Sequence, residues 1–143
     1  MKPLYKSEFV SSYWCEDRSL IYHEIRDISF DDVELNSIQN KLSEVYLHLK
    51  TNDIKFHQIY HPSKNINFRV SHMKTVTNFA RFLKSQDEVI DEHCKGVSVI
   101  HTNGYVIKTI NYFIKLFENK IPVKVVKNEE DAYKFLNLKK ELS

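Results

Sequence analysis

The chain has 143 residues, of which 42% are hydrophobic and 28% charged, so it has enough apolar material for one globular domain with a single core. Its 21 basic and 19 acidic residues give a formal charge of +2, far from the basic excess of proteins that bind phosphate backbones. Only two glycines, Gly96 and Gly104, are present, which excludes the P-loop and the G-x-G-x-x-G turn.

Two apolar runs at the amino end, residues 9–14 and 20–25, predict a β-hairpin because both are rich in aromatic and branched side chains. The polar residues 16–19 between them favour a turn. A helix is predicted next. Asp31 offers a capping carboxylate, Glu34 follows three residues later, and apolar residues then recur at spacings of three and four until about residue 51.

Residues 54–60 alternate in a way that predicts a strand, and His61 and Pro62 are expected to end it. Ser71 predicts the N-cap of a second helix, whose apolar residues keep helical spacing up to residue 83. The polar stretch 85–92 allows two interpretations: the helix continues through these residues, or it breaks among them.

Residues 96–100 predict a short, mostly apolar strand, and a helix with one apolar face follows Asn103 and Gly104. Residues 121–126 predict the last strand, in which Pro122 is tolerated because it lies at the start. Residues 128–131 favour the first turn of a final helix, where the helix dipole stabilises acidic side chains.

The predicted order of elements is ββαβαβαβα. Strands that alternate with helices of this length favour a mainly parallel sheet with right-handed crossovers. We therefore predict an α/β fold with a mainly parallel five-stranded sheet, an antiparallel hairpin at one edge, and one domain over residues 1–143.

The chain contains no run of about 18 uncharged apolar residues, and its first nine residues are too polar for a signal peptide. We expect a cytoplasmic protein that does not insert into a membrane. Two cysteines, Cys15 and Cys94, cannot form the disulfide framework of a small secreted domain, so both are expected to be reduced thiols.

Four segments of the carboxyl half carry a resemblance to a known family: Gly-Val-Ser-Val-Ile at 96–100, Asn-Gly at 103–104, the strand at 121–126 and Asn-Glu-Glu-Asp-Ala at 128–132. The resemblance is to the STAS domain, the fold of anti-sigma-factor antagonists. It covers residues 20–138 by element order and 96–136 by residue type, and it implies a regulatory module that binds another protein. Regulatory members carry a phosphorylatable serine in an Asp-Ser-Ser-Gly-like turn; the matching segment 61–72 lacks that motif and offers Ser63 and Ser71.

Open parallel sheets bind ligands beyond the carboxyl ends of their strands, where helix N-termini present unpaired N–H groups. This rule selects two loops, 61–72 and 101–105, as a surface for an anion or a protein. A plainer interpretation remains open, in which Ser71 and Asn103 do no more than cap helices. The candidate binding residues are Ser63, Lys64, Arg69, Ser71, His72, Thr102, Asn103, Gly104 and Tyr105.

No metal site, cofactor or catalytic group is predicted. His57 and His61 would lie about 13 Å apart along a strand, too far to share a metal ion. Cys94 precedes a core strand and is interpreted as a buried apolar residue, and Cys15 follows the first strand beside Glu16, which disfavours its thiolate.

We expect a non-enzymatic, STAS-like interaction module with a protein partner, not a nucleic acid. Two alternatives stay open. One is a structural component of an oligomeric or viral assembly that pairs through the aromatic residues of the amino-terminal hairpin. The other is a small-molecule-binding enzyme.

Overall fold

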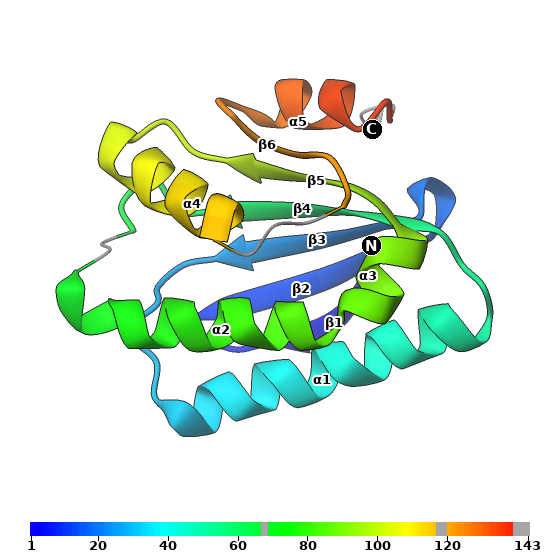
Figure 1. Ribbon diagram of the computed structural model, residues 1–143, viewed down its shortest axis with the longest axis horizontal. Coiled ribbons are helices and arrows are strands. Elements are labelled where there is room, and N and C mark those ends of the chain that lie inside the picture. Colours follow the sequence, from blue (N-terminus) through cyan, green and yellow to red (C-terminus); the bar gives the residue numbers. More distant parts are fainter. Residues whose placement is uncertain (67–68, 117–119, 139–143) are drawn as a thin grey trace.

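A mixed six-stranded sheet forms the centre of the molecule, and the computed structural model describes residues 1–66, 69–116 and 120–138. The strands lie in the sheet in the same order as in the chain (Figure 1). The first two pairs are antiparallel and the other three are parallel. The strands are β1 (Lys2–Lys6), β2 (Val10–Cys15), β3 (Leu20–Ile25), β4 (Phe56–Pro62), β5 (Cys94–Ile100) and β6 (Val123–Val126).

The predicted α/β class, with its hairpin followed by parallel strands and helices, is confirmed. The sheet has six strands where five were predicted, because Lys2–Lys6 pairs antiparallel with β2. This segment contains two lysines and Pro3, and its register shifts between Pro3 and Tyr5. Lysine, proline and bulges are typical of edge strands, which are thereby protected from pairing with other chains.

Within residues 1–66, 69–116 and 120–138, five α-helices connect or follow the parallel strands: α1 (Asp32–Thr51), α2 (Met73–Ser85), α3 (Asp87–His93), α4 (Gly104–Leu116) and α5 (Glu129–Phe135). The helix after β4 breaks at Gln86, which separates α2 from α3 and settles the open question about the polar stretch. In the described part of the chain, no helix combines the length and the apolar character needed to cross a membrane.

Two helix caps lie where the sequence predicts them. The Asp31 carboxylate accepts a hydrogen bond from the backbone N–H of Glu34 at 3.0 Å, and the Asn128 side chain accepts one from Asp131 at 2.8 Å. The predicted cap at Ser71 is wrong. Residues Val70–His72 form a 3-10 turn, so the N-cap of α2 lies one residue later, at His72, whose side chain makes no cap bond.

Two strand ends also differ from the prediction. His61 and Pro62 belong to β4, because parallel pairing with β3 continues to Ile25 and Pro62. A proline fits at this last position, where the missing N–H group interrupts no further ladder bond. The edge strand β6 begins at Val123, after Pro122, whereas the prediction started this strand at residue 121.

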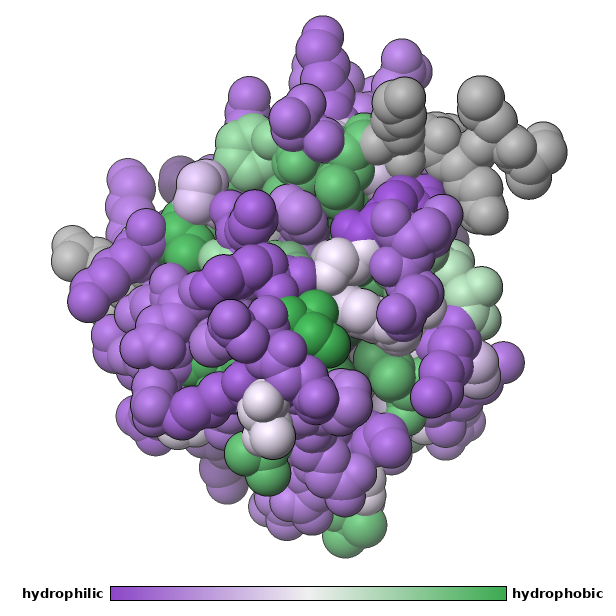
Figure 2. Space-filling view, turned by 90° about the vertical axis from the view of Figure 1, so that its right-hand side faces the viewer, coloured by the Kyte–Doolittle hydropathy of each residue, from purple (hydrophilic) through white to green (hydrophobic). Residues whose placement is uncertain are grey.

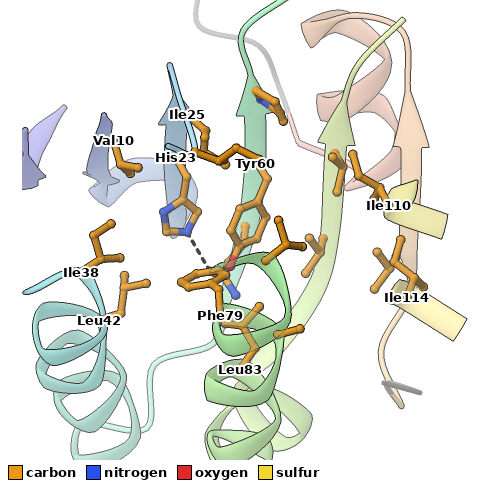
Figure 3. Close-up of a pocket in the computed structure, with 18 of the residues that line it drawn as sticks. Val10, His23, Ile25, Ile38, Leu42, Tyr60, Phe79, Leu83, Ile110 and Ile114 are labelled. Carbon is orange, nitrogen blue, oxygen red and sulfur yellow. Dashed lines mark hydrogen bonds between the residues drawn. The ribbon is translucent and has the colours of Figure 1, made fainter. Parts of the chain in front are cut away.

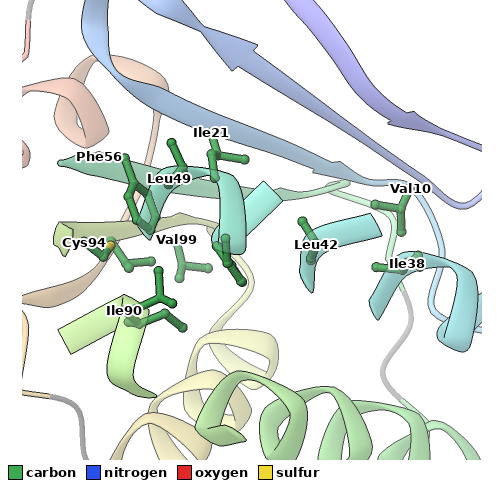
Figure 4. Packing of buried hydrophobic residues seen from close by; sticks show 12 residues of the cluster. Val10, Ile21, Ile38, Leu42, Leu49, Phe56, Ile90, Cys94 and Val99 are labelled. Carbon is green, nitrogen blue, oxygen red and sulfur yellow. The ribbon is translucent and has the colours of Figure 1, made fainter. Parts of the chain in front are cut away.

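The main core lies on the face of the sheet that α1 and α3 cover (Figure 4). Helix α5 packs on the opposite face, where Ala132, Tyr133 and Leu136 join buried residues of β3, β4, β5 and β6. Leu136 comes so close to β5 that a Cβ added at Gly96 would lie 3.0 Å from its Cδ2 atom. Most of the helical mass therefore covers one face, and α5 covers part of the other (Figure 1).

Candidate functional site

The two loops that the sequence selects meet beyond the carboxyl ends of β4 and β5. The His101 side chain, 3% exposed, lies between them. Its Nδ1 atom accepts the backbone N–H of Asn103 at 3.1 Å, so the ring proton is on Nε2, which donates to the carbonyl oxygen of Ser63 at 3.0 Å. We call the surface built from residues 63–66, 69–72 and 101–105 the rim.

A small apolar cluster lies beneath the rim and supports it. Ile28 from the β3–α1 connection, Ile66 from the first loop and Val106 from α4 are all buried in this cluster. The rim is therefore anchored by the partly buried His101–Ser63 hydrogen bond and by three buried side chains from separate parts of the chain.

Most of the predicted binding residues lie on the surface. Ser63 and His72 are partly buried, and the other seven are exposed, with Tyr105 at 62%. Asn103 caps α4, since its Oδ1 atom accepts from the backbone N–H groups of Tyr105 at 3.0 Å and Val106 at 3.2 Å. The exposed residues are Lys64, Arg69, Ser71, Thr102, Asn103, Gly104 and Tyr105.

The end of the molecule opposite the rim carries none of the nine predicted binding residues. Figure 2 shows this end as mainly hydrophilic, with apolar residues in patches that polar side chains separate. The coloured residues in this view form no broad apolar surface for docking.

A hydrogen-bonded group on the α5 face was missed by the sequence analysis. The Tyr22 hydroxyl donates to Glu129 Oε1 at 2.8 Å, and its oxygen lies 2.6 Å from His61 Nδ1. Burial, with the hydrogen bond to Glu129 as the next cause, raises the pKa of Tyr22 well above its usual value. The phenol stays protonated and serves to join β3, β4 and α5.

A second polar group that the sequence did not reveal is buried on the main-core face. Ser12 Oγ donates to His23 Nδ1 at 2.7 Å, and His23 Nε2 donates to Gln58 Oε1 at 2.9 Å. The hydroxyls of Tyr46 and Tyr60 reach the same Gln58 oxygen at 2.9 and 3.2 Å. Burial lowers the pKa of His23 to about 4, so this chain of polar groups is uncharged at neutral pH.

A cavity of about 260 Å³ lies against this polar group, between the sheet and helices α1, α2 and α4 (Figure 3). Its walls are mainly apolar. Ile38 and Leu42 of α1, Phe79 and Leu83 of α2, and Ile110 of α4 line it. The helical spacing of the apolar residues on α2 is visible in the sequence, but the space between that face and the sheet is not.

Three side chains of types used in catalysis and metal binding, Cys15, His93 and Cys94, are buried. Cys15 and Cys94 are buried free thiols, and burial raises the pKa of Cys94 to about 11. His93 Nε2 lies 3.1 Å from Asp53 Oδ1. Among residues 1–66, 69–116 and 120–138, no three side chains of His, Cys, Asp or Glu come together as a metal site.

Comparison with known proteins identifies a family but no characterised relative. Neither the curated proteins nor the solved structures include a match to this chain. One family model, described as a domain of unknown function, DUF7793, matches residues 61–140. The match includes both loops of the rim and covers more than half of the 143 residues. The chain belongs to the DUF7793 family of domains of unknown function.

Proposed function

We propose that this protein is a non-enzymatic, STAS-like interaction module that binds another protein through the rim. The observation that carries the proposal is the hydrogen bond from His101 to the Ser63 carbonyl oxygen. It holds two loops from different crossovers in a fixed relative position, and a preformed surface binds a partner at a smaller cost in conformational entropy.

The charge of the rim supports an acidic partner surface. Segments 61–72 and 101–105 contain no Asp or Glu, whereas Lys64 and Arg69 are exposed cations. Hydrogen bonds to Ser29 lower the pKa of the Asp27 carboxyl most, and the nearby His72 side chain lowers that pKa further. Opposite charges on the two partners would speed association and orient the complex.

The STAS resemblance supports regulation by phosphate. Of the two serines in the segment that matches the family's phosphorylated turn, Ser71 is exposed, whereas the Ser63 hydroxyl accepts the backbone N–H of Asn65 at 3.3 Å. Ser71 is thus the serine that a kinase would reach more easily. A phosphate there would reverse the charge of the rim and weaken binding to an acidic partner.

Self-association through the amino-terminal hairpin has less support. Tyr5, Phe9 and Trp14 are partly buried and pack against the main core, so they are already in use within the chain. An oligomer whose mass does not change on dilution would nevertheless favour this alternative over the rim.

The proposal is tested by capture of partners on tagged wild-type protein and on two matched variants in the cells that make it. Arg69→Glu changes the rim, and Arg81→Glu makes the same change at an exposed position of α2. We expect a partner that wild type and Arg81→Glu retain and Arg69→Glu loses. Equal capture by both variants would overturn the proposal.

A further inference from the structure

We propose that the cavity between the sheet and helices α1, α2 and α4 is a binding site for an uncharged, mainly hydrocarbon small molecule. At about 260 Å³ it exceeds the roughly 150 Å³ of an apolar cavity that holds benzene. A substituted ring or a chain of about eight carbons is therefore a suitable size. No described rim residue lines this site, although Ile28 of the cluster beneath the rim does, and the inference does not depend on the function proposed for the rim.

The walls of the cavity provide the apolar contacts. Three helices and the sheet contribute side chains that point into the same space (Figure 3). Val97 and Val99 of β5 form part of the floor. The labelled helical residues around it are Ile38, Leu42, Phe79, Leu83, Ile110 and Ile114.

Helix α2 shows that the described side chains leave this space unfilled. The helix has 13 residues with an apolar face, yet none of its residues is fully buried. Phe79 and Leu83 contact the main core and also line the cavity, and both side chains are only partly buried. Apolar atoms beside an unfilled space lack dispersion contacts, and a hydrocarbon ligand would supply them.

The polar residues of the cavity favour an uncharged ligand. Ser12, His23, Gln58 and Tyr60 line its sheet side, and they already bond to one another as a neutral group. Lys84 is the single charged residue among the described lining residues, and its Nζ atom is paired with Asp87 at 3.2 Å. A buried carboxylate would find no free counter-charge, so its desolvation would oppose binding.

The first test uses 1-octanol and octanoate as probes with the purified 143-residue chain at pH 7. Titration calorimetry should show saturable binding of 1-octanol, with a rise in Tm, and at least about tenfold weaker binding of octanoate. Methyl chemical shifts should change at Val99, Leu83 and Ile110 when 1-octanol binds. Absence of saturable 1-octanol binding, or equal binding of octanoate, would overturn the proposal.

Matched valine substitutions locate the bound probe. Val99→Phe fills the floor of the cavity, whereas Val33→Phe makes the same change at a position of α1 that is 73% exposed. We expect Val99→Phe to abolish binding of 1-octanol and Val33→Phe to leave it unchanged. If Val99→Phe does not fold, Ala80→Phe on α2 makes the same test from the opposite wall. Unchanged binding in the folded cavity variant would contradict the assignment.

Discussion

His101 joins the carboxyl ends of two parallel strands by donating a hydrogen bond from Nε2 to the carbonyl oxygen of Ser63 at 3.0 Å. Ser63 follows β4 and His101 follows β5, so the bond links residues 38 positions apart. The same ring accepts from Asn103, which in turn caps α4. One buried imidazole therefore fixes the first loop, the second loop and a helix start.

Replacing this imidazole should destabilise the protein. His101→Ala leaves the Ser63 carbonyl without its donor and opens a gap beneath the rim, so we expect the free energy of unfolding to fall by about 1–3 kcal/mol. Urea denaturation measures this loss. His48→Ala is the control, because His48 is exposed on α1 and its removal should change stability by less than about 0.5 kcal/mol. Equal losses in the two variants would show that His101 has no special role.

Arg69→Glu should leave the fold intact. Arg69 is exposed, so reversing its charge should shift stability by no more than about 0.5 kcal/mol. Circular dichroism and thermal melting beside wild type and Arg81→Glu measure this. A large drop in Tm for Arg69→Glu alone would mean that Arg69 supports the fold, and its effect on partner capture would then say nothing about the rim.

The buried His23 should make stability depend on pH. Its pKa is about 4 in the folded protein and about 6.5 in the unfolded chain, because burial disfavours the charged ring. Between these values the unfolded chain binds a proton that the folded protein does not. The free energy of unfolding should therefore fall as pH decreases from about 6.5 to about 4, by up to about 3 kcal/mol.

Urea denaturation at several pH values checks this dependence with two variants. His23→Gln should flatten the decrease in stability below pH 6.5, whereas His48→Gln at an exposed position should keep it. A wild-type slope that persists in His23→Gln would assign the pH dependence to other groups.

Alanine substitutions near the starts of α5 and α2 should change stability by different amounts, because only α5 has a side-chain cap bond at its N-cap. Asn128→Ala removes the acceptor for the Asp131 N–H group and should cost about 1 kcal/mol. Ser71→Ala should cost less than about 0.5 kcal/mol, because Ser71 is exposed and lies before the N-cap of α2. Chemical denaturation of both variants measures the two losses of unfolding free energy. A larger loss for Ser71→Ala than for Asn128→Ala would contradict the start of α2 at Met73.

Features set by neighbouring residues were predictable, and features set by packing were not. The cap at Asp31 depends on residues three positions apart, and sequence spacing is enough to find it. Strand β1 was missed because lysines and Pro3 conceal an edge strand, whose pairing depends on β2. The Tyr22–Glu129 bond spans 107 positions, and only the folded sheet brings its ends together.

The candidate site was likewise predictable only in part. The two loops were predictable because parallel strands end at a common edge, and His101 lies in one of them. Its bond to Ser63 was not predictable, since it depends on how the two loops pack. The cavity was equally hidden, because it depends on the distance between the half-buried face of α2 and the sheet.

Photo-crosslinking from two tyrosine positions on α4 tests the rim most directly. Tyr105 lies on the rim and is 62% exposed, and Tyr112 lies two turns later and is 60% exposed. With benzoylphenylalanine placed at either position in the native cells, we predict a crosslink to a different protein from position 105 and none from position 112. Equal crosslinks from both positions, none from position 105, or a crosslink only to a second copy of this chain would contradict a rim that binds a protein partner.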